Sequence, residues 1–209
     1  MARNTSAALK NLQRGARTPQ GESLQWGYYD TLKLSNTVRD YDFFLAGLGA
    51  NYGGVNKTEA QTNLPSSGTI PQGHRLWIYD IHVSYWSHEA KPTTFIQQLY
   101  AFIWGAWTKL GIVGKDAMLF LPLSEYIGQV MYTAITPTAA GDNLPFTQGI
   151  FKGIYPLSKP IVLPALQNFS LKIVANTLPA ASISGEVPVI GQDNDELRFL
   201  LNGKLERLG

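Results

Sequence analysis

Residues 76–86, LWIYDIHVSYW, decide the fold class of this chain. Their odd positions, from Trp77 to Tyr85, are all aromatic or aliphatic, whereas their even positions include Asp80 and His82. Successive side chains of a β-strand point to opposite faces of a sheet, so this period of two predicts a strand whose odd-numbered face lies in a core. The alternation holds over eleven residues, a length typical of a strand in a β-sandwich.

Strand patterns recur along most of the remaining chain. Asn202-Gly203 predicts a tight hairpin turn near the end, and segment 126–134 fits either a strand or a short helix. Residues 47–73 and 135–148, rich in Gly, Asn and Pro, are predicted loops. Because no amphipathic helix of 10–15 residues is predicted, the pattern favours an all-β domain over a parallel α/β sheet. Further strands are predicted at 25–34, 39–46, 94–104, 108–113, 117–123, 149–155, 160–164, 168–175 and 197–201.

The composition fits a chain of strands and turns that associates with other chains. The 209 residues include 20 Gly, 12 Pro, 5 Trp, 10 Tyr and 9 Phe, and only 15% are charged, which is below the usual quarter. Low charge with many aromatic side chains is typical of the buried centre of protein interfaces. The chain has no cysteine, which excludes disulfides, thiol nucleophiles, iron–sulfur clusters and zinc sites of the Cys type.

The first twenty residues differ from the rest of the chain in charge. They carry +4 with no acid, whereas the remaining residues carry 13 basic and 15 acidic groups. We therefore interpret residues 1–24 as a basic arm, with a short helix at 6–14, and residues 25–209 as the β domain. The candidate contacts to a polyanion or a membrane are Arg3, Lys10, Arg14 and Arg17. Such phosphate contacts are sensitive to salt and read no bases. A frayed terminus is the alternative interpretation.

No motif in the chain predicts catalysis or a cofactor. The segment 43–54, FFLAGLGANYGG, resembles a dinucleotide-binding turn, but no amphipathic helix follows that would bind a pyrophosphate, so we interpret it as a loop. The chain has no GxxxxGK[ST] phosphate loop and no GxSxG nucleophile elbow. We therefore expect no enzyme, no cofactor and no small-molecule substrate.

Two polar groups are weaker candidates for binding. The histidines are His74, His82 and His88. Their spacing to carboxylates does not match a metal site, so we interpret them as surface side chains and expect no metal there. The acidic turn 193–196 contains Asp193 and Asp195, whose oxygens are of the type that binds calcium. The turn lacks the glycine and the distal glutamate of an EF-hand, and a solvated loop is the favoured interpretation.

Aromatic side chains around the long strand allow two interpretations. They could form a platform on which a sugar stacks, or they could pack in the core and in interfaces, which we favour because most lie on the apolar face or in apolar runs. The residues concerned are Trp77, Tyr79, Tyr85, Trp86, Trp104 and Trp107.

Three stretches of the chain together resemble a known family. A polar loop leads into the long strand at 62–86, TNLPSSGTIPQGHRLWIYDIHVSYW. An extended segment follows at 157–176, LSKPIVLPALQNFSLKIVAN, and the chain closes on 195–209, DELRFLLNGKLERLG. In this order they resemble the jelly-roll coat (capsid) proteins of small icosahedral bacteriophages, which are lipid-containing or have single-stranded DNA. The resemblance extends over roughly residues 60–209 and rests on pattern rather than on one invariant motif.

This resemblance implies a jelly-roll β-sandwich, here a single barrel with long loops, with a compact double jelly roll as the alternative. It implies trimer or pentamer capsomers of the same chain, contacts with other virion proteins, and an arm that faces the genome or an internal membrane. The protein would be made in the host cytoplasm and located in the virion. We therefore hypothesise a structural protein that self-assembles into an icosahedral shell. The alternatives are a carbohydrate-binding or receptor-binding β-sandwich protein of a phage, and a β-sandwich glycosidase, for which no residue gives positive evidence.

Overall fold

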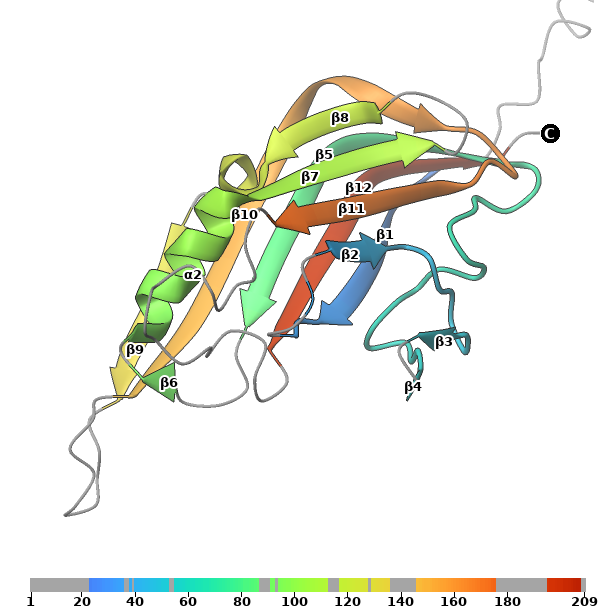
Figure 1. Ribbon diagram of the computed structural model, residues 1–209. Helices are drawn as coiled ribbons and strands as arrows, with labels where there is room; N and C mark the ends of the chain where they lie inside the picture. Colours follow the sequence, from blue (N-terminus) through green and yellow to red (C-terminus); the bar gives the residue numbers. More distant parts are fainter. Residues whose placement is uncertain are drawn as a thin grey trace, which may run out of the picture.

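The chain folds into two antiparallel sheets packed face to face, as a computed structural model shows (Figure 1). Every pairing among the described strands is antiparallel, which confirms the all-β prediction. The structure describes residues 23–35, 38, 40–52, 55–86, 91–92, 94–112, 117–127, 129–135, 146–175 and 195–207.

The larger sheet has the order β1-β12-β5-β10-β6, and β9 also pairs with β10. These strands are β1 (Ser23–Lys33), β12 (Glu196–Arg207), β5 (His74–Trp86), β10 (Phe146–Leu163), β6 (Lys91–Pro92) and β9 (Gln129–Ile135). The smaller sheet has the order β2-β11-β7-β8. Its strands are β2 (Asp40–Phe43), β11 (Phe169–Ala175), β7 (Ala106–Ile112) and β8 (Ala117–Pro122).

The connection between β2 and β5 is mostly loop, as predicted for residues 47–73. Its described residues contain only the two-residue strands β3 (Asn51–Tyr52) and β4 (Val55–Asn56), which pair with each other. Gly49 in this segment has a φ of 77°, the left-handed conformation expected of a glycine loop. No nucleotide-binding helix follows it, since β3 begins at Asn51.

Alternating apolar side chains build the core between the sheets. Phe43 on β2 contacts Phe199 on β12 edge to face, with ring centroids 4.9 Å apart, so aromatic rings join the two sheets directly. Strand β11 follows the predicted alternation, because Phe169, Leu171 and Ile173 are all buried.

The long strand β5 is confirmed, but its predicted buried face is wrong in the first half. Ile81, Val83 and Tyr85 are buried as expected, whereas the buried residues before them are at even positions, Leu76 and Ile78. On β12, the consecutive residues Asn202 and Gly203 pair with Asp80 and Ile78, so Tyr79 is an extra residue relative to β12, a β-bulge. The bulge shifts the alternation by one residue, and Trp77 and Tyr79 therefore point away from the core.

The strand predicted at 94–104 is wrong, because these residues form the helix α2 (Thr94–Gly105). Its buried residues Leu99, Phe102 and Ile103 lie at the i, i+3, i+4 spacing of one helix face. The expectation that no helix of 10–15 residues would occur is wrong for the same reason. Among the described residues, neither α2 nor the 3₁₀ helix η1 (Leu123–Tyr126) is long and apolar enough to cross a membrane.

The predicted hairpin turn at Asn202-Gly203 is also wrong, because β12 runs through it without a turn. A side chain at Gly203 would collide with the carbonyl oxygen of Trp77, so glycine is required for close approach of two strands rather than for a turn. Segment 126–134 divides into the end of η1 and strand β9. The strands predicted at 149–155 and 160–164 are one strand, β10, with a register shift between Pro156 and Ile161.

Candidate functional site

The most distinctive surface of the molecule is apolar and lies around β8. On the outer face of the smaller sheet, Trp107 and Phe120 stack with ring centroids 4.9 Å apart and an interplanar angle of 18°. Phe120 is 57% exposed and Met118 is 38% exposed. The C-terminal end of α2 adjoins this sheet, since Gly105 is followed directly by β7, and Trp104 there is 71% exposed. We call Trp104, Trp107, Met118 and Phe120 the β8 surface.

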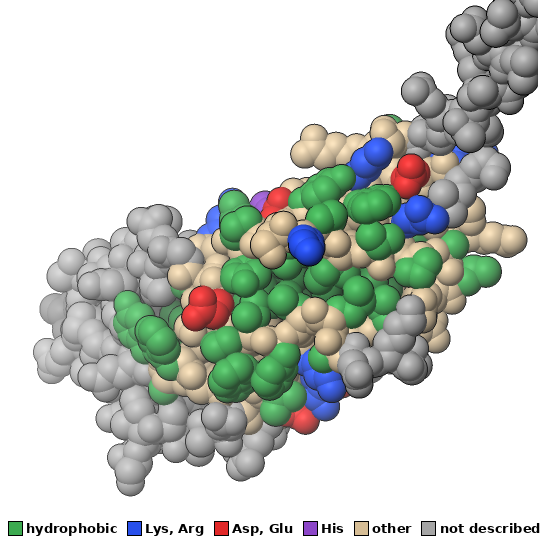
Figure 2. Space-filling model, turned by 90° about the horizontal axis from the view of Figure 1, so that it is seen from above, with side chains coloured by type: hydrophobic (Ala, Val, Ile, Leu, Met, Phe, Trp, Pro, Cys, Tyr) green, Lys and Arg blue, Asp and Glu red, His purple; other side chains and the backbone are tan. Residues whose placement is uncertain are grey.

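Figure 2 looks onto the side of the molecule on which β8 lies and shows hydrophobic side chains gathered over it, with only scattered charges. Single exposed apolar residues are ordinary on protein surfaces, but a contiguous group of aromatic side chains marks an interaction site. The sequence of β8, AMLFLP, contains no charged or polar side chain. Among the described strands β8 pairs only with β7, so its other side is an open edge.

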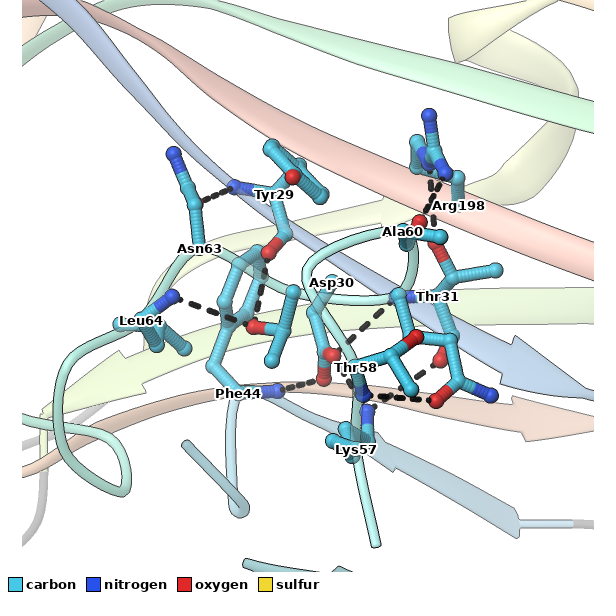
Figure 3. A network of polar contacts seen from close by, with 12 residues as sticks. Tyr29, Asp30, Thr31, Phe44, Lys57, Thr58, Ala60, Asn63, Leu64 and Arg198 are labelled. Carbon is cyan, nitrogen blue, oxygen red and sulfur yellow. Dashed lines mark hydrogen bonds and ion pairs between the residues drawn. The ribbon is translucent and has the colours of Figure 1, made fainter. Parts of the chain in front are cut away.

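A second feature is a buried ion pair that attaches a loop to β1 (Figure 3). Asp30 on β1 is fully buried and Lys57 in the loop is 5% exposed, and the Lys57 Nζ contacts the Asp30 carboxylate. The same carboxylate accepts hydrogen bonds from the backbone N–H of Phe44 at 2.6 Å and of Thr31 at 3.1 Å. Burial raises the pKa of Asp30, and this effect outweighs Lys57 and the two backbone donors, which lower it.

The loop that carries Lys57 also covers the outer edge of β1. The side chain of Asn63 makes two hydrogen bonds to the backbone of β1, as a neighbouring strand would. Its Nδ2 donates to the Gly27 carbonyl at 2.8 Å, and its Oδ1 accepts from the Tyr29 N–H at 2.8 Å. Thr62 donates to the Tyr29 carbonyl at 3.0 Å. Arg198 from β12 fastens the loop from the other side, since its Nη2 donates to the Ala60 carbonyl at 2.6 Å. This edge of the larger sheet is therefore closed.

Beside the ion pair lies a cavity of about 370 Å³, lined among others by Thr31, Leu34, Tyr52 and Lys57. Two lysines, Lys33 and Lys57, are among its lining residues. Lys57 already contacts Asp30 and donates to the Thr31 carbonyl at 3.2 Å, so its charge stabilises the loop and is compensated within the protein.

A third feature is a polar cluster on the outer face of the larger sheet. Asp80 accepts hydrogen bonds from Asn202 Nδ2 at 3.0 and 3.1 Å, and His82 Nε2 lies 2.5 Å from its Oδ1. The bulged Tyr79 is 45% exposed beside a cavity of about 320 Å³, which Gln25, Asp80 and Asn202 also line. A half-exposed aromatic ring next to amide and carboxylate groups is the kind of site that binds a sugar.

The structure separates most of the residues singled out in the sequence. Tyr85 is in the core, Trp104 is on α2 and Trp107 is on the smaller sheet, so the six aromatic side chains do not form one platform. His74 Nδ1 lies 3.0 Å from the Gln72 carbonyl, and His82 belongs to the Asp80 cluster. The arm residues Arg3, Lys10, Arg14 and Arg17, the helix predicted at 6–14, and His88 lie outside the described residues.

The acidic turn differs from the solvated loop that we favoured. Asp193 lies outside the described residues, but Asp195 is fully buried and its carbonyl accepts a hydrogen bond from the Leu34 N–H at 2.8 Å. Burial, and then the neighbouring Asp195 carboxylate, raise the pKa of Tyr85. Asp195 therefore packs against the core, and in the described part of the chain no three His, Asp or Glu side chains are grouped as metal ligands.

Comparison with known proteins adds no relative. No protein-family model, no curated protein and no solved structure matches the chain. What the protein does must therefore follow from its own topology and surfaces.

Proposed function

We propose that this chain is a coat subunit: a single jelly-roll barrel that assembles with copies of itself into a closed shell. The strand order is the observation that carries the proposal. Eight strands make up the sandwich when the two-residue strands β3, β4 and β6 and the edge strand β9 are set aside. Numbered from 1 to 8 along the chain, they are β1, β2, β5, β7, β8, β10, β11 and β12. The two sheets then have the orders 1-8-3-6 and 2-7-4-5.

In this numbering the antiparallel neighbours include the pairs 1–8, 2–7, 3–6 and 4–5. A long hairpin of eight strands that wraps around a core produces these pairs, and the result is a jelly roll of two Greek keys. The two sheets contain one set of these eight strands, whereas a double jelly roll would need two sets, so the strand count supports a single barrel. A jelly roll alone does not determine function, because many unrelated activities use the same fold.

The β8 surface supports assembly in particular. Monomeric proteins rarely leave a hydrophobic edge strand without charges, since it can pair with another chain. The low charge of the whole sequence, 15%, fits a molecule of which much of the surface is covered by neighbours. Trimer or pentamer capsomers and location in a virion belong to the same proposal.

Light scattering of the purified full-length chain tests this function. We expect oligomers or shells of discrete size that grow with protein concentration. A chain that stays monomeric at the highest attainable concentration, with its sandwich folded by circular dichroism, would exclude a coat function.

The second candidate is a carbohydrate-binding protein, which the cavity beside Tyr79 favours. Glycan-array binding by the wild-type chain, lost in Tyr79→Ala and Asn202→Ala, would support it. Equal binding by wild-type and variant chains would place the sugar elsewhere, and the absence of all binding would remove this candidate.

A further inference from the structure

We propose that two copies of this chain pair through the open edges of their β8 strands, across a two-fold axis perpendicular to the smaller sheet. The two four-stranded sheets then form one continuous eight-stranded sheet with both cores on the same side. This inference rests on the proposed function, because it names one contact through which the subunits assemble.

The edges formed by β1, β2 and the second half of β10 are protected in ways that β8 is not. The loop at residues 58–64 closes the edge of β1. Strand β9 covers the first half of β10 and is a second uncharged edge among the described strands, but the stacked rings of Trp107 and Phe120 lie at β8. The second half of β10 contains Pro156, Lys159 and Pro160, residues that discourage pairing with another strand. Strand β2 is four residues long and carries Asp40 and Asp42.

Within the part of the chain that the structure describes, strand β8 has none of these protections. It is six residues long, begins with Ala117 and has its single proline, Pro122, at the last position. Half of the backbone N–H and C=O groups of such a strand point away from its one neighbour. A second strand is the partner that satisfies these groups in register, whereas a lipid surface would leave them without hydrogen bonds.

The absence of charge on β8 favours a second copy over a different protein. In a two-fold contact each residue meets the same surface of its copy, so a charged side chain near the axis would face a like charge. Strand β8 brings only apolar side chains there, AMLFLP, and the exposed Lys109, which pairs with Phe120, lies on β7, on the side of β8 away from the axis. Because both sheets turn the same face outwards, the outward-pointing residues of one β8 strand lie opposite those of the other. Phe120 of one chain then lies opposite Phe120 of the second chain. Leu119 then pairs with Leu121 of the second copy.

The exposed apolar side chains supply part of the area that such a contact uses. Trp104 is 71% exposed, Phe120 57% and Met118 38%. Because large side chains have about 150–250 Å² each to bury, these three offer on the order of 300 Å² per copy. A standard interface buries about 800 Å² per partner, so these side chains supply less than half of it, and the backbone edge of β8 and its neighbouring residues must supply the rest.

The experiment uses single-cysteine variants of the full chain, which has no cysteine of its own. Phe120→Cys places a thiol next to the two-fold axis. Ile154→Cys is the matched control, because Ile154 is 55% exposed and lies on the outer face of the other sheet. Under mild oxidation or with a short bismaleimide, we expect cross-linked dimers of Phe120→Cys and at most traces for Ile154→Cys.

A charge at the axis provides the second readout. We expect Phe120→Lys to weaken dimerisation at least about tenfold, because two ammonium groups meet in the contact, and Ile154→Lys to leave it unchanged. Circular dichroism of both variants verifies folding, and the cysteine variants retain the test if Phe120→Lys unfolds.

The outcomes separate this inference from the proposed function. If the wild-type chain forms oligomers but Phe120→Cys cross-links no better than Ile154→Cys, the β8 pairing is wrong and the coat function stands. If the wild-type chain is a monomer, both are wrong. If Phe120→Lys releases the chain from phospholipid vesicles without changing its oligomers, the surface binds lipid and the pairing is again wrong.

Discussion

Lys57 and Asp30 form an ion pair inside the protein, where the lysine is 5% exposed and the aspartate fully buried. The pair joins the long loop after β2 to the edge strand β1. The Asp30 carboxylate also accepts the N–H of Phe44, whose φ of 68° is unusual for a residue with a side chain. One carboxylate thus fixes both the loop and the turn that leads into it.

Removing the lysine should therefore destabilise the fold strongly. We expect Lys57→Met to lower the free energy of unfolding by about 3–5 kcal/mol, because it leaves a buried carboxylate without its cation. Urea denaturation followed by tryptophan fluorescence measures this change.

Lys172→Met is the matched control, since Lys172 pairs with Asp40 at 3.2 Å on the exposed face of the smaller sheet. We expect it to cost less than about 1 kcal/mol. Equal losses in the two variants would contradict a structural role for the buried pair.

Part of this arrangement could be predicted from the sequence. Tyr28, Asp30 and Leu32 are two residues apart in a predicted strand, so an aspartate in phase with apolar residues signals a buried carboxylate. The structure buries all three. Lys57 gives no such signal, because it is one polar residue in a polar loop and its partner is 27 residues earlier.

Other features required the three-dimensional pairing. The bulge at Tyr79 shifts the alternation of β5 by one residue, yet the odd positions Trp77, Tyr79 and Ile81 are all apolar or aromatic, so the sequence pattern looks continuous. In the segment 94–104 the polar residues Thr94, Gln97 and Gln98 are too few to distinguish the period of a helix from that of a strand. The aromatic and β-branched residues of the segment therefore favour a strand in the sequence analysis. Open edges such as that of β8 depend on which strands are neighbours, which one sequence does not contain.

The bulge predicts a strict requirement at Gly203. We expect Gly203→Ala to destabilise the protein by about 3 kcal/mol or more, because the added Cβ would collide with the Trp77 carbonyl. Gly111→Ala on β7 is the control, since no atom lies within 4 Å of the position of its Cβ. Thermal unfolding monitored by circular dichroism compares them, and an unchanged melting temperature for Gly203→Ala would show that the strands do not approach as closely.

Tyr126 predicts a loss of stability at high pH. It is buried and its hydroxyl accepts a hydrogen bond from Thr108 at 2.8 Å. Burial raises the pKa of Tyr126 to about 12 from its ordinary 10.0, against the lowering effect of Thr108. The folded state therefore retains a proton that the unfolded chain releases, so stability is full below pH 10 and falls as the pH rises towards 12.

We expect Tyr126→Phe to weaken this loss of stability at high pH by roughly 3 kcal/mol, because phenylalanine has no proton to release. Urea midpoints measured between about pH 9 and pH 12 provide the comparison. Tyr79→Phe, on the surface, should retain the wild-type dependence. If both variants follow the wild-type curve, Tyr126 does not stay protonated in the folded state.

The basic arm gives a prediction that concerns partners. Replacing Arg3, Lys10, Arg14 and Arg17 by Gln should weaken binding of the chain to single-stranded oligonucleotides and flatten its salt dependence. The logarithm of the wild-type binding constant should fall with that of the salt concentration with a slope no steeper than about −3, because each of four phosphate contacts to a single strand contributes about −0.7. Unchanged binding in the variant would assign the contact to another part of the chain.

Assembly of this all-β chain with copies of itself is tested most directly by electron microscopy of the purified full-length protein. We predict closed shells or capsomers of one symmetry in wild-type samples, and their disruption by Phe120→Lys but not by Ile154→Lys. Single folded molecules without regular assemblies, at any protein concentration and ionic strength tried, would contradict the claim.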